Sequence, residues 1–176
     1  MYTCAHCRYH SGFLSMQKEK LLVIALSGIG DALMFTPALQ LIKKHKPELT
    51  IDALVMYKGV EDIYTRTGLF DKVHYFNFLK EGAVSSLSYV LKLRGLYSHS
   101  INVYPANRKE YNIIAFLMGA KTRGGINYKR AANKELGFLN NVSISEDDTR
   151  HNVMLNALLA GKMFGFSVED APPLLF

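Results

Sequence analysis

A short segment with two glycines and an aspartate is the first part of the sequence that could do chemistry. This SGIGD segment, residues 27–31, directly follows the apolar run LLVIAL at residues 21–26. Gly28 and Gly30 allow the backbone to approach a ligand closely, and a helix starting here would offer unpaired N–H groups to an anion. Asp31 at such a helix start is stabilised as the carboxylate, which suits a general base. The alternative is that Asp31 only caps the helix.

The glycine segment does not fit a dinucleotide-binding loop. The third glycine of that fingerprint would stand three residues after Gly30, where the sequence has Leu33. An acidic residue should also end the second strand and hold a ribose, but Asp52 lies inside the second apolar run. The sequence therefore disfavours NAD as a ligand.

A second polar group follows the fourth apolar run. Asn107, Arg108 and Lys109 come shortly after residues 100–104. Because the carboxyl ends of parallel strands share one edge of a sheet, we expect these cations on the same edge as Asp31, where they could bind phosphates or an acidic sugar. The alternative is that Asn107 caps a helix whose first turn is solvated.

The only two cysteines lie close together near the start of the sequence. Cys4, Cys7 and His10 have the spacing of a partial zinc knuckle, with His6 between them. A structural zinc site needs four ligands, so we favour no metal site and interpret residues 1–19 as a mobile N-terminal extension or the result of an upstream start codon. Since no disulfide framework and no secretory signal are recognisable, we expect a cytoplasmic protein.

Alternating apolar runs and helical patterns are the elements that must position these side chains. We predict five strands, at residues 21–26, 51–56, 72–76, 100–104 and 122–126. We predict helices between and after them, at residues 31–45, 60–67, 83–96, 108–118 and 150–164. Residues 21–42 are long and apolar enough to span a membrane, but Asp31 and the glycines favour a strand, a turn and a helix. The pattern predicts an α/β protein with a Rossmann-like, doubly wound, mostly parallel sheet.

Length and charge limit the function. The chain has 176 residues, 49% of them hydrophobic, which is enough for one compact core and too few for two full α/β domains. Its formal charge of +6 would attract an acidic ligand, an anionic membrane surface or a nucleic acid. We find no nucleic-acid-binding motif, so nucleic acid is not an expected partner.

Three segments carry a resemblance to a known family. The segment LLVIALSGIGDALMFTPALQLIKKHKPELTIDALV resembles the opening strand, loop and helix of the family 9 glycosyltransferases, the lipopolysaccharide heptosyltransferase group. INVYPANRKEYNIIAFLMGAKTRGGINYKR resembles that family's fourth-strand loop, helix and short glycine-containing strand, and RHNVMLNALLAGKMFGF resembles the helix that closes its first domain. The resemblance covers residues 20–166.

The resemblance implies one half of a two-domain GT-B enzyme. Such enzymes transfer heptose from an ADP-sugar to the lipopolysaccharide core, with inversion and without a metal or other cofactor. The N-terminal domain mainly holds the acceptor. Asp31 would then be the general base, and Ser27, Gly28, Gly30 and the Asn107–Lys109 group would bind substrate.

The same resemblance implies a division of the chain. Residues 1–19 would be the extension, 20–166 the acceptor-side domain and 167–176 an interrupted interdomain linker. The isolated half would be inactive without a donor domain, which a separate C-terminal chain could supply. A phosphorylated acceptor implies contact with the cytoplasmic face of the inner membrane. The alternative function is a non-catalytic module that binds an anionic glycan or a nucleotide.

Overall fold

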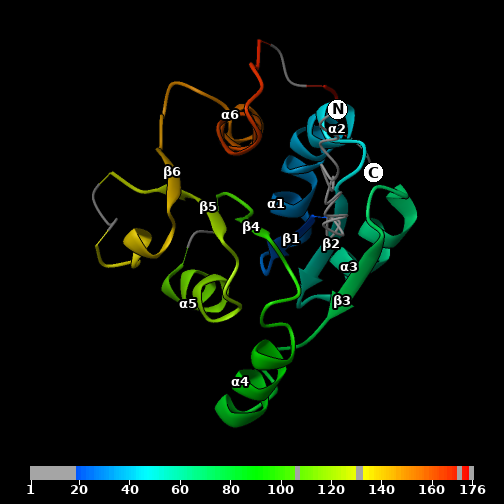
Figure 1. The fold of residues 1–176 in the computed structure, drawn as a ribbon, viewed down its shortest axis with the longest axis vertical. Helices are drawn as coiled ribbons and strands as arrows, with labels where there is room; N and C mark the ends of the chain where they lie inside the picture. The colour runs from blue at the N-terminus through cyan, green and yellow to red at the C-terminus, as the bar shows by residue number, and fades with distance from the viewer. Residues whose placement is uncertain (1–18, 106–107, 130–132, 170–171, 175–176) are drawn as a thin grey trace, which may run out of the picture.

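Six parallel strands form a single sheet in the order β3-β2-β1-β4-β5-β6 (Figure 1). The computed structural model describes residues 19–105, 108–129, 133–169 and 172–174. The strands are β1 (Lys20–Ala25), β2 (Thr50–Val55), β3 (Lys72–Tyr75), β4 (His99–Asn102), β5 (Thr122–Asn127) and β6 (Val142–Ser145). The helices are α1 (Ile29–Met34), α2 (Thr36–His45), α3 (Lys58–Thr67), α4 (Ala83–Lys92), α5 (Lys109–Leu117), the short 3-10 helix η1 (Gly137–Leu139) and α6 (Asn152–Phe164). The Rossmann-like, doubly wound fold that the sequence predicts is confirmed.

Strand β1 is at the centre of the sheet. It pairs with β2 on one side and β4 on the other, so that Leu22 stands opposite both Asp52 and Ser100. Residues 21–25 are at most 1% exposed, because helices cover both faces of the sheet. Burial on both faces explains why this strand is a continuous apolar run in the sequence.

The side chains of β1 alternate between two hydrophobic cores. Leu21, Val23 and Ala25 pack in a core with α1, α2, α3 and α6. Leu22 and Ile24 pack in a second core with α4 and α5. Figure 1 shows α2 and α6 on one side of the sheet and α5 and α4 on the other. Because successive side chains of a strand point to opposite faces of the sheet, β1 contributes side chains to both cores.

The single helix predicted over residues 31–45 is wrong. The chain forms α1 and α2 instead, which meet at the fully buried Phe35. Pro37 lies in the first turn of α2, where a helix tolerates a residue without an N–H. The same proline would interrupt the backbone hydrogen bonds of one helix that continued from α1. The hydroxyl of Thr36 donates to the carbonyl of Leu33 (2.9 Å) and closes the junction.

Two further differences from the prediction concern β6 and α4, whereas the other boundaries differ by two residues or fewer. Strand β6 was not predicted, because its four residues, VSIS, are half polar and none of them is fully buried. Helix α4 ends at Lys92 and not at Leu96, since the chain tightens into a turn and Gly95 adopts a positive φ of 76°. The N–H of Gly95 then donates to the carbonyl of Met118 at the end of α5 (3.0 Å).

Residues 21–42 do not form a membrane span. They form β1, α1 and α2, as the strand, turn and helix interpretation predicts. No helix in the described part of the chain has the length and apolarity needed to cross a bilayer.

The segment after α6 lies on α2. Phe166 stacks on His45 with ring centroids 4.5 Å apart, and the side-chain amide of Gln40 donates to the carbonyl of Pro173 (2.8 Å). Cys4, Cys7 and His10, which have the spacing of a partial zinc knuckle, lie outside the described residues.

Candidate functional site

The loop after β1 lies where the winding of the sheet reverses. The chain runs outward from β1 to β2 and β3, returns to the other side of β1 and continues through β4, β5 and β6. Loops at the carboxyl ends of β1 and β4 therefore diverge, and open α/β sheets bind ligands at this place. Both predicted groups, the SGIGD segment and the group around Arg108, follow these two strands.

The glycines of this loop border open space. A Cβ atom built on Gly28 or on Gly30 would meet no other atom within 4 Å. Ser27, just before them, is only 7% exposed, and its buried hydroxyl has no hydrogen-bond partner in the described residues. The loop thus has room for a ligand close to its backbone and one buried polar group without a partner.

Asp31 is in the first turn of α1 and is half-buried. Its carboxylate forms no hydrogen bond or ion pair with any described residue, so no capping hydrogen bond from this side chain is present. Helix α1 is anchored to α3, because the hydroxyl of the buried Tyr64 donates to the carbonyl of Ala32, the residue after Asp31 (2.9 Å). Burial raises the pKa of Tyr64, so this donor keeps its proton. A free carboxylate is therefore held on a rigid support.

Tyr111 connects the two loops of the site. This residue of α5 is 7% exposed, and its hydroxyl donates to the carbonyl of Leu26 at the end of β1 (2.9 Å). Burial raises the pKa of Tyr111, the positive charge of Arg108 opposes this shift, and the carboxylate of Asp31 adds to it. Arg108 and Asp31 are thus both near enough to Tyr111 to act on its phenol, although they are 77 positions apart in the chain.

The start of α5 is capped by a distant glutamate. Arg108 is the N-cap residue, one position later than the predicted Asn107, and no side-chain capping bond comes from it. Instead the carboxylate of Glu135 accepts a hydrogen bond from the backbone N–H of Lys109 (2.9 Å). The ammonium group of Lys109 lies 4.0 Å from the carboxylate of Glu110, with both side chains exposed.

The three residues of the predicted Asn107–Lys109 group therefore differ in how available their side chains are to a ligand. Arg108 is exposed and forms no ion pair or hydrogen bond with the described residues, so it is free to bind an anion. Lys109 is close to a carboxylate and its N–H is already capped. Asn107 lies outside the described residues.

Asn156 is a positioning residue that the sequence analysis did not find. This fully buried residue of α6 accepts a hydrogen bond from the N–H of Tyr104 (3.1 Å) and donates to the carbonyl of the same residue (2.9 Å). It thereby fixes the backbone just after β4, from which the Arg108 segment continues. Burial raises the pKa of Tyr104 to about 12. An asparagine inside the apolar stretch VMLNALLA was the available signal.

Three buried asparagines hold α5 against the sheet. The side-chain oxygen of Asn112 accepts hydrogen bonds from Asn102 (2.7 Å) and Asn140 (2.8 Å), and its amide donates to the carbonyl of Glu135 (2.7 Å). Gly125 makes room for this group, because a Cβ there would lie 2.4 Å from the amide nitrogen of Asn140. The capping residue Glu135 is thus fixed by the core.

Asp52 belongs to a separate buried cluster. It lies inside β2, as the sequence predicts, and accepts a hydrogen bond from the hydroxyl of Tyr97 (2.8 Å). That hydroxyl accepts one from Nε2 of His74 (2.9 Å), since its only proton goes to Asp52. Burial alone would raise the pKa of Asp52, but the nearby His74, whose Nε2 lies 3.7 Å from the carboxylate, and the hydrogen bond from Tyr97 prevail and lower it. The cluster joins β2, β3 and the segment that precedes β4.

A metal centre is not found in the described ranges, where no three His, Cys, Asp or Glu side chains come together. A free carboxylate, a free guanidinium and glycines beside open space suit an anionic substrate with a hydroxyl to be deprotonated.

The fold and this edge define a Rossmann-like α/β domain of the kind that forms one half of the GT-B heptosyltransferases. The solved structures that it resembles include heptosyltransferases and a family 9 glycosyltransferase. No protein-family model and no curated protein matches the sequence.

Three solved structures illustrate the match. The E. coli heptosyltransferase WaaC, solved with ADP-2-deoxy-2-fluoro heptose, has a TM-score of 0.70 and 16% identity over 87% of this chain and 50% of its own. The E. coli ADP-heptose lipopolysaccharide heptosyltransferase II has a TM-score of 0.69 and 17% identity over 89% of this chain and 45% of its own. A family 9 glycosyltransferase from Veillonella parvula has a TM-score of 0.67 and 17% identity over 89% of this chain and 44% of its own. The chain thus spans about half the length of these proteins.

Proposed function

We propose that this chain is the acceptor-side domain of a family 9 glycosyltransferase, with Asp31 as its general base. The observation that carries the proposal is the free carboxylate of Asp31 beside the open glycine loop, at the point where the sheet reverses its winding. The likeness to heptosyltransferase structures supports it. The sugar transferred would be a heptose and the acceptor a phosphorylated sugar of the lipopolysaccharide core.

The proposed reaction is an inverting displacement. A hydroxyl oxygen of the acceptor attacks the anomeric carbon of an ADP-activated sugar, and the bond from that carbon to the diphosphate breaks. Asp31 takes the proton of the hydroxyl, and ADP leaves with the electron pair of the broken bond. Because Asp31 has no partner in the described residues, its carboxylate can face the acceptor without first breaking a hydrogen bond.

Arg108 is the residue that we propose to hold the acceptor phosphate. Its guanidinium is exposed and unpaired among the described residues, and a planar fork suits a phosphate better than an ammonium group does. Ser27 and the glycines would contact the acceptor from the other loop. The donor would bind to a second domain, which a separate chain could supply.

Titration calorimetry tests the binding part of the proposal. We expect the protein to bind a phosphorylated core sugar and not ADP, and we expect Arg108→Gln to weaken that binding about tenfold or more. Arg66→Gln is the matched control, because Arg66 is an exposed cation in the last turn of α3, near the opposite edge of the sheet. Binding of ADP alone would favour a nucleotide-binding module, and equal losses for both variants would remove Arg108 from the site.

Sugar transfer tests the catalytic part. The chain is mixed with a separately produced donor domain, and product is measured by mass spectrometry. Asp31→Asn should lower the rate about 100-fold or more while leaving acceptor binding intact, because the amide keeps the shape but cannot take a proton. Asp62→Asn, an exposed carboxylate on α3, should be as active as the wild type. Acceptor binding without any transfer would support the non-catalytic glycan-binding module.

A further inference from the structure

Helix α4 has an apolar outer face. Its inner face packs on the body through Tyr89, which stacks on Phe76 with ring centroids 4.2 Å apart, and through the buried Val90. Val84, Leu87 and Leu91 are spaced three and four residues apart, so they share the opposite face, where they are 84%, 47% and 44% exposed. The outer face of a surface helix is normally polar. This helix is apolar on both faces.

Two further exposed leucines lie in the connections on either side of the helix. Leu79, in the connection before α4, is 72% exposed, and Leu96, after it, is 55% exposed. We call the five side chains Leu79, Val84, Leu87, Leu91 and Leu96 the α4 surface. Figure 1 shows α4 at one end of the molecule, projecting away from α2 and α6. Exposed apolar patches of this kind mark interaction sites.

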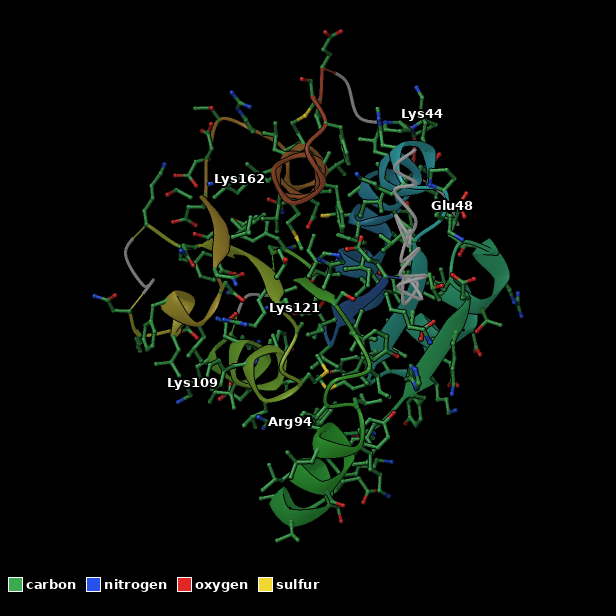
Figure 2. All side chains as sticks on the ribbon, viewed as in Figure 1. Lys44, Glu48, Arg94, Lys109, Lys121 and Lys162 are labelled. Carbon is green, nitrogen blue, oxygen red and sulfur yellow. The ribbon has the colours of Figure 1, made fainter. Side chains whose placement is uncertain are left out.

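Basic side chains flank the α4 surface. Lys80 precedes the helix, Lys92 ends it and Arg94 follows it, against the single carboxylate of Glu81. Figure 2 shows Arg94 at the end of α4 that lies toward α5. None of the three cations forms an ion pair within the described part of the chain. Their long aliphatic stems can lie along an apolar surface while the charges stay in water.

We propose that the α4 surface docks this protein on an anionic lipid bilayer. Leucines and valine would enter the boundary between headgroups and acyl chains, and the flanking cations would contact lipid phosphates. Charge complementarity favours this occupant, because the flanks of α4 and the whole chain, at +6, are both positive. The proposal does not depend on sugar transfer or on Asp31.

Flotation with vesicles tests the docking directly. The wild-type protein should float with phosphatidylcholine vesicles that contain phosphatidylglycerol, and less so as salt is raised or with phosphatidylcholine alone. The double variant Val84→Gln/Leu87→Gln should lower the bound fraction about tenfold or more. Both residues are exposed, so circular dichroism melting should stay close to that of the wild type. Phe138→Gln, at a 70% exposed side chain on η1, is the matched control and should bind like the wild type.

A tryptophan probe reports which face enters the lipid. The chain has no tryptophan, so Leu87→Trp gives a single emission signal from α4 and Phe138→Trp a single signal from η1. On adding anionic vesicles, the emission of Leu87→Trp should shift to the blue and be quenched by brominated lipids, whereas that of Phe138→Trp should not change. Absence of flotation by the wild type, equal loss in the Phe138→Gln control, or an unchanged Leu87→Trp emission would each overturn the proposal. So would an α4-dependent dimer that does not bind vesicles.

Discussion

Replacing Asn156 by alanine tests how the loop after β4 is held. The Asn156 side chain satisfies both backbone groups of Tyr104, at 3.1 Å and 2.9 Å, and also donates to the carbonyl of Asn152 one turn earlier in α6 (3.0 Å). Asn156 is fully buried and Tyr104 is 7% exposed. Asn156→Ala therefore leaves an N–H and a C=O of Tyr104 without partners in a place that water reaches poorly.

The expected cost follows from those two groups. A buried polar group that loses its partner costs about 1–3 kcal/mol, and here there are two. Alanine recovers about 0.5 kcal/mol because it is the better helix former. We expect Asn156→Ala to lower the free energy of unfolding by about 1.5–5.5 kcal/mol, which is roughly 10- to 8,000-fold in the unfolding equilibrium.

Urea denaturation followed by circular dichroism measures this free energy. Asn152→Ala is the matched control on the same helix, because among the described residues its side chain makes only a long contact with the sulfur of Met34 (3.8 Å). It should cost less than about 0.5 kcal/mol. A change of less than about 0.5 kcal/mol for Asn156→Ala would refute the reasoning, since it would mean that the backbone of Tyr104 finds other partners at no cost.

Two other substitutions have expected outcomes that depend on buried groups. The pKa of Asp52 is lowered in the folded protein, so its contribution to stability is complete above its unfolded value of 3.8 and is lost as the pH falls through the folded value. Tyr97→Phe removes one of the hydrogen bonds that lower this pKa. The difference in the free energy of unfolding between wild type and variant should therefore be largest near pH 7 and should shrink below about pH 4. A difference that stays constant over this pH range in urea titrations would contradict this expectation. Gly125→Ala would bring a methyl group within 2.4 Å of the amide nitrogen of Asn140 and should lower the unfolding midpoint in urea clearly more than Gly30→Ala, which meets nothing within 4 Å. Equal midpoints for the two glycine variants would show that Asn140 moves aside freely.

The arrangement of the sheet could be predicted from the sequence because its central strands are buried on both faces. Residues 21–26 are a continuous apolar run and residues 51–56 are one that only Asp52 interrupts, and the structure has β1 and β2 within one residue of them. Strand β6 lacked this signal, since it lies at the edge of the sheet and is half polar. The break at Phe35 depends on Pro37. The apolar residues on both sides of this break keep a helical periodicity, so the pattern predicted one continuous helix.

The candidate site could be predicted only in part. The topology of parallel strands was enough to expect Asp31 and Arg108 on one edge, because both follow the carboxyl ends of neighbouring strands. That Glu135 caps α5 could not be predicted, since a contact over 26 residues depends on how the chain folds around β5. The apolar outer face of α4 was also missed. The spacing of its leucines predicts a helix, but this spacing does not show which of the two apolar faces of the helix packs on the sheet.

The contacts that orient the site all join distant parts of the chain. Tyr111 and Leu26 are 85 residues apart, Tyr104 and Asn156 are 52 apart, and Tyr64 bonds to the carbonyl of Ala32 next to Asp31 over 32 residues. A local segment such as SGIGD therefore cannot form the site alone, because its direction is set by α3 and α5. This explains why a helix-capping aspartate and a general base look identical in sequence. A capping aspartate accepts a hydrogen bond from a backbone N–H in the folded chain, and among the described residues the carboxylate of Asp31 forms no such bond.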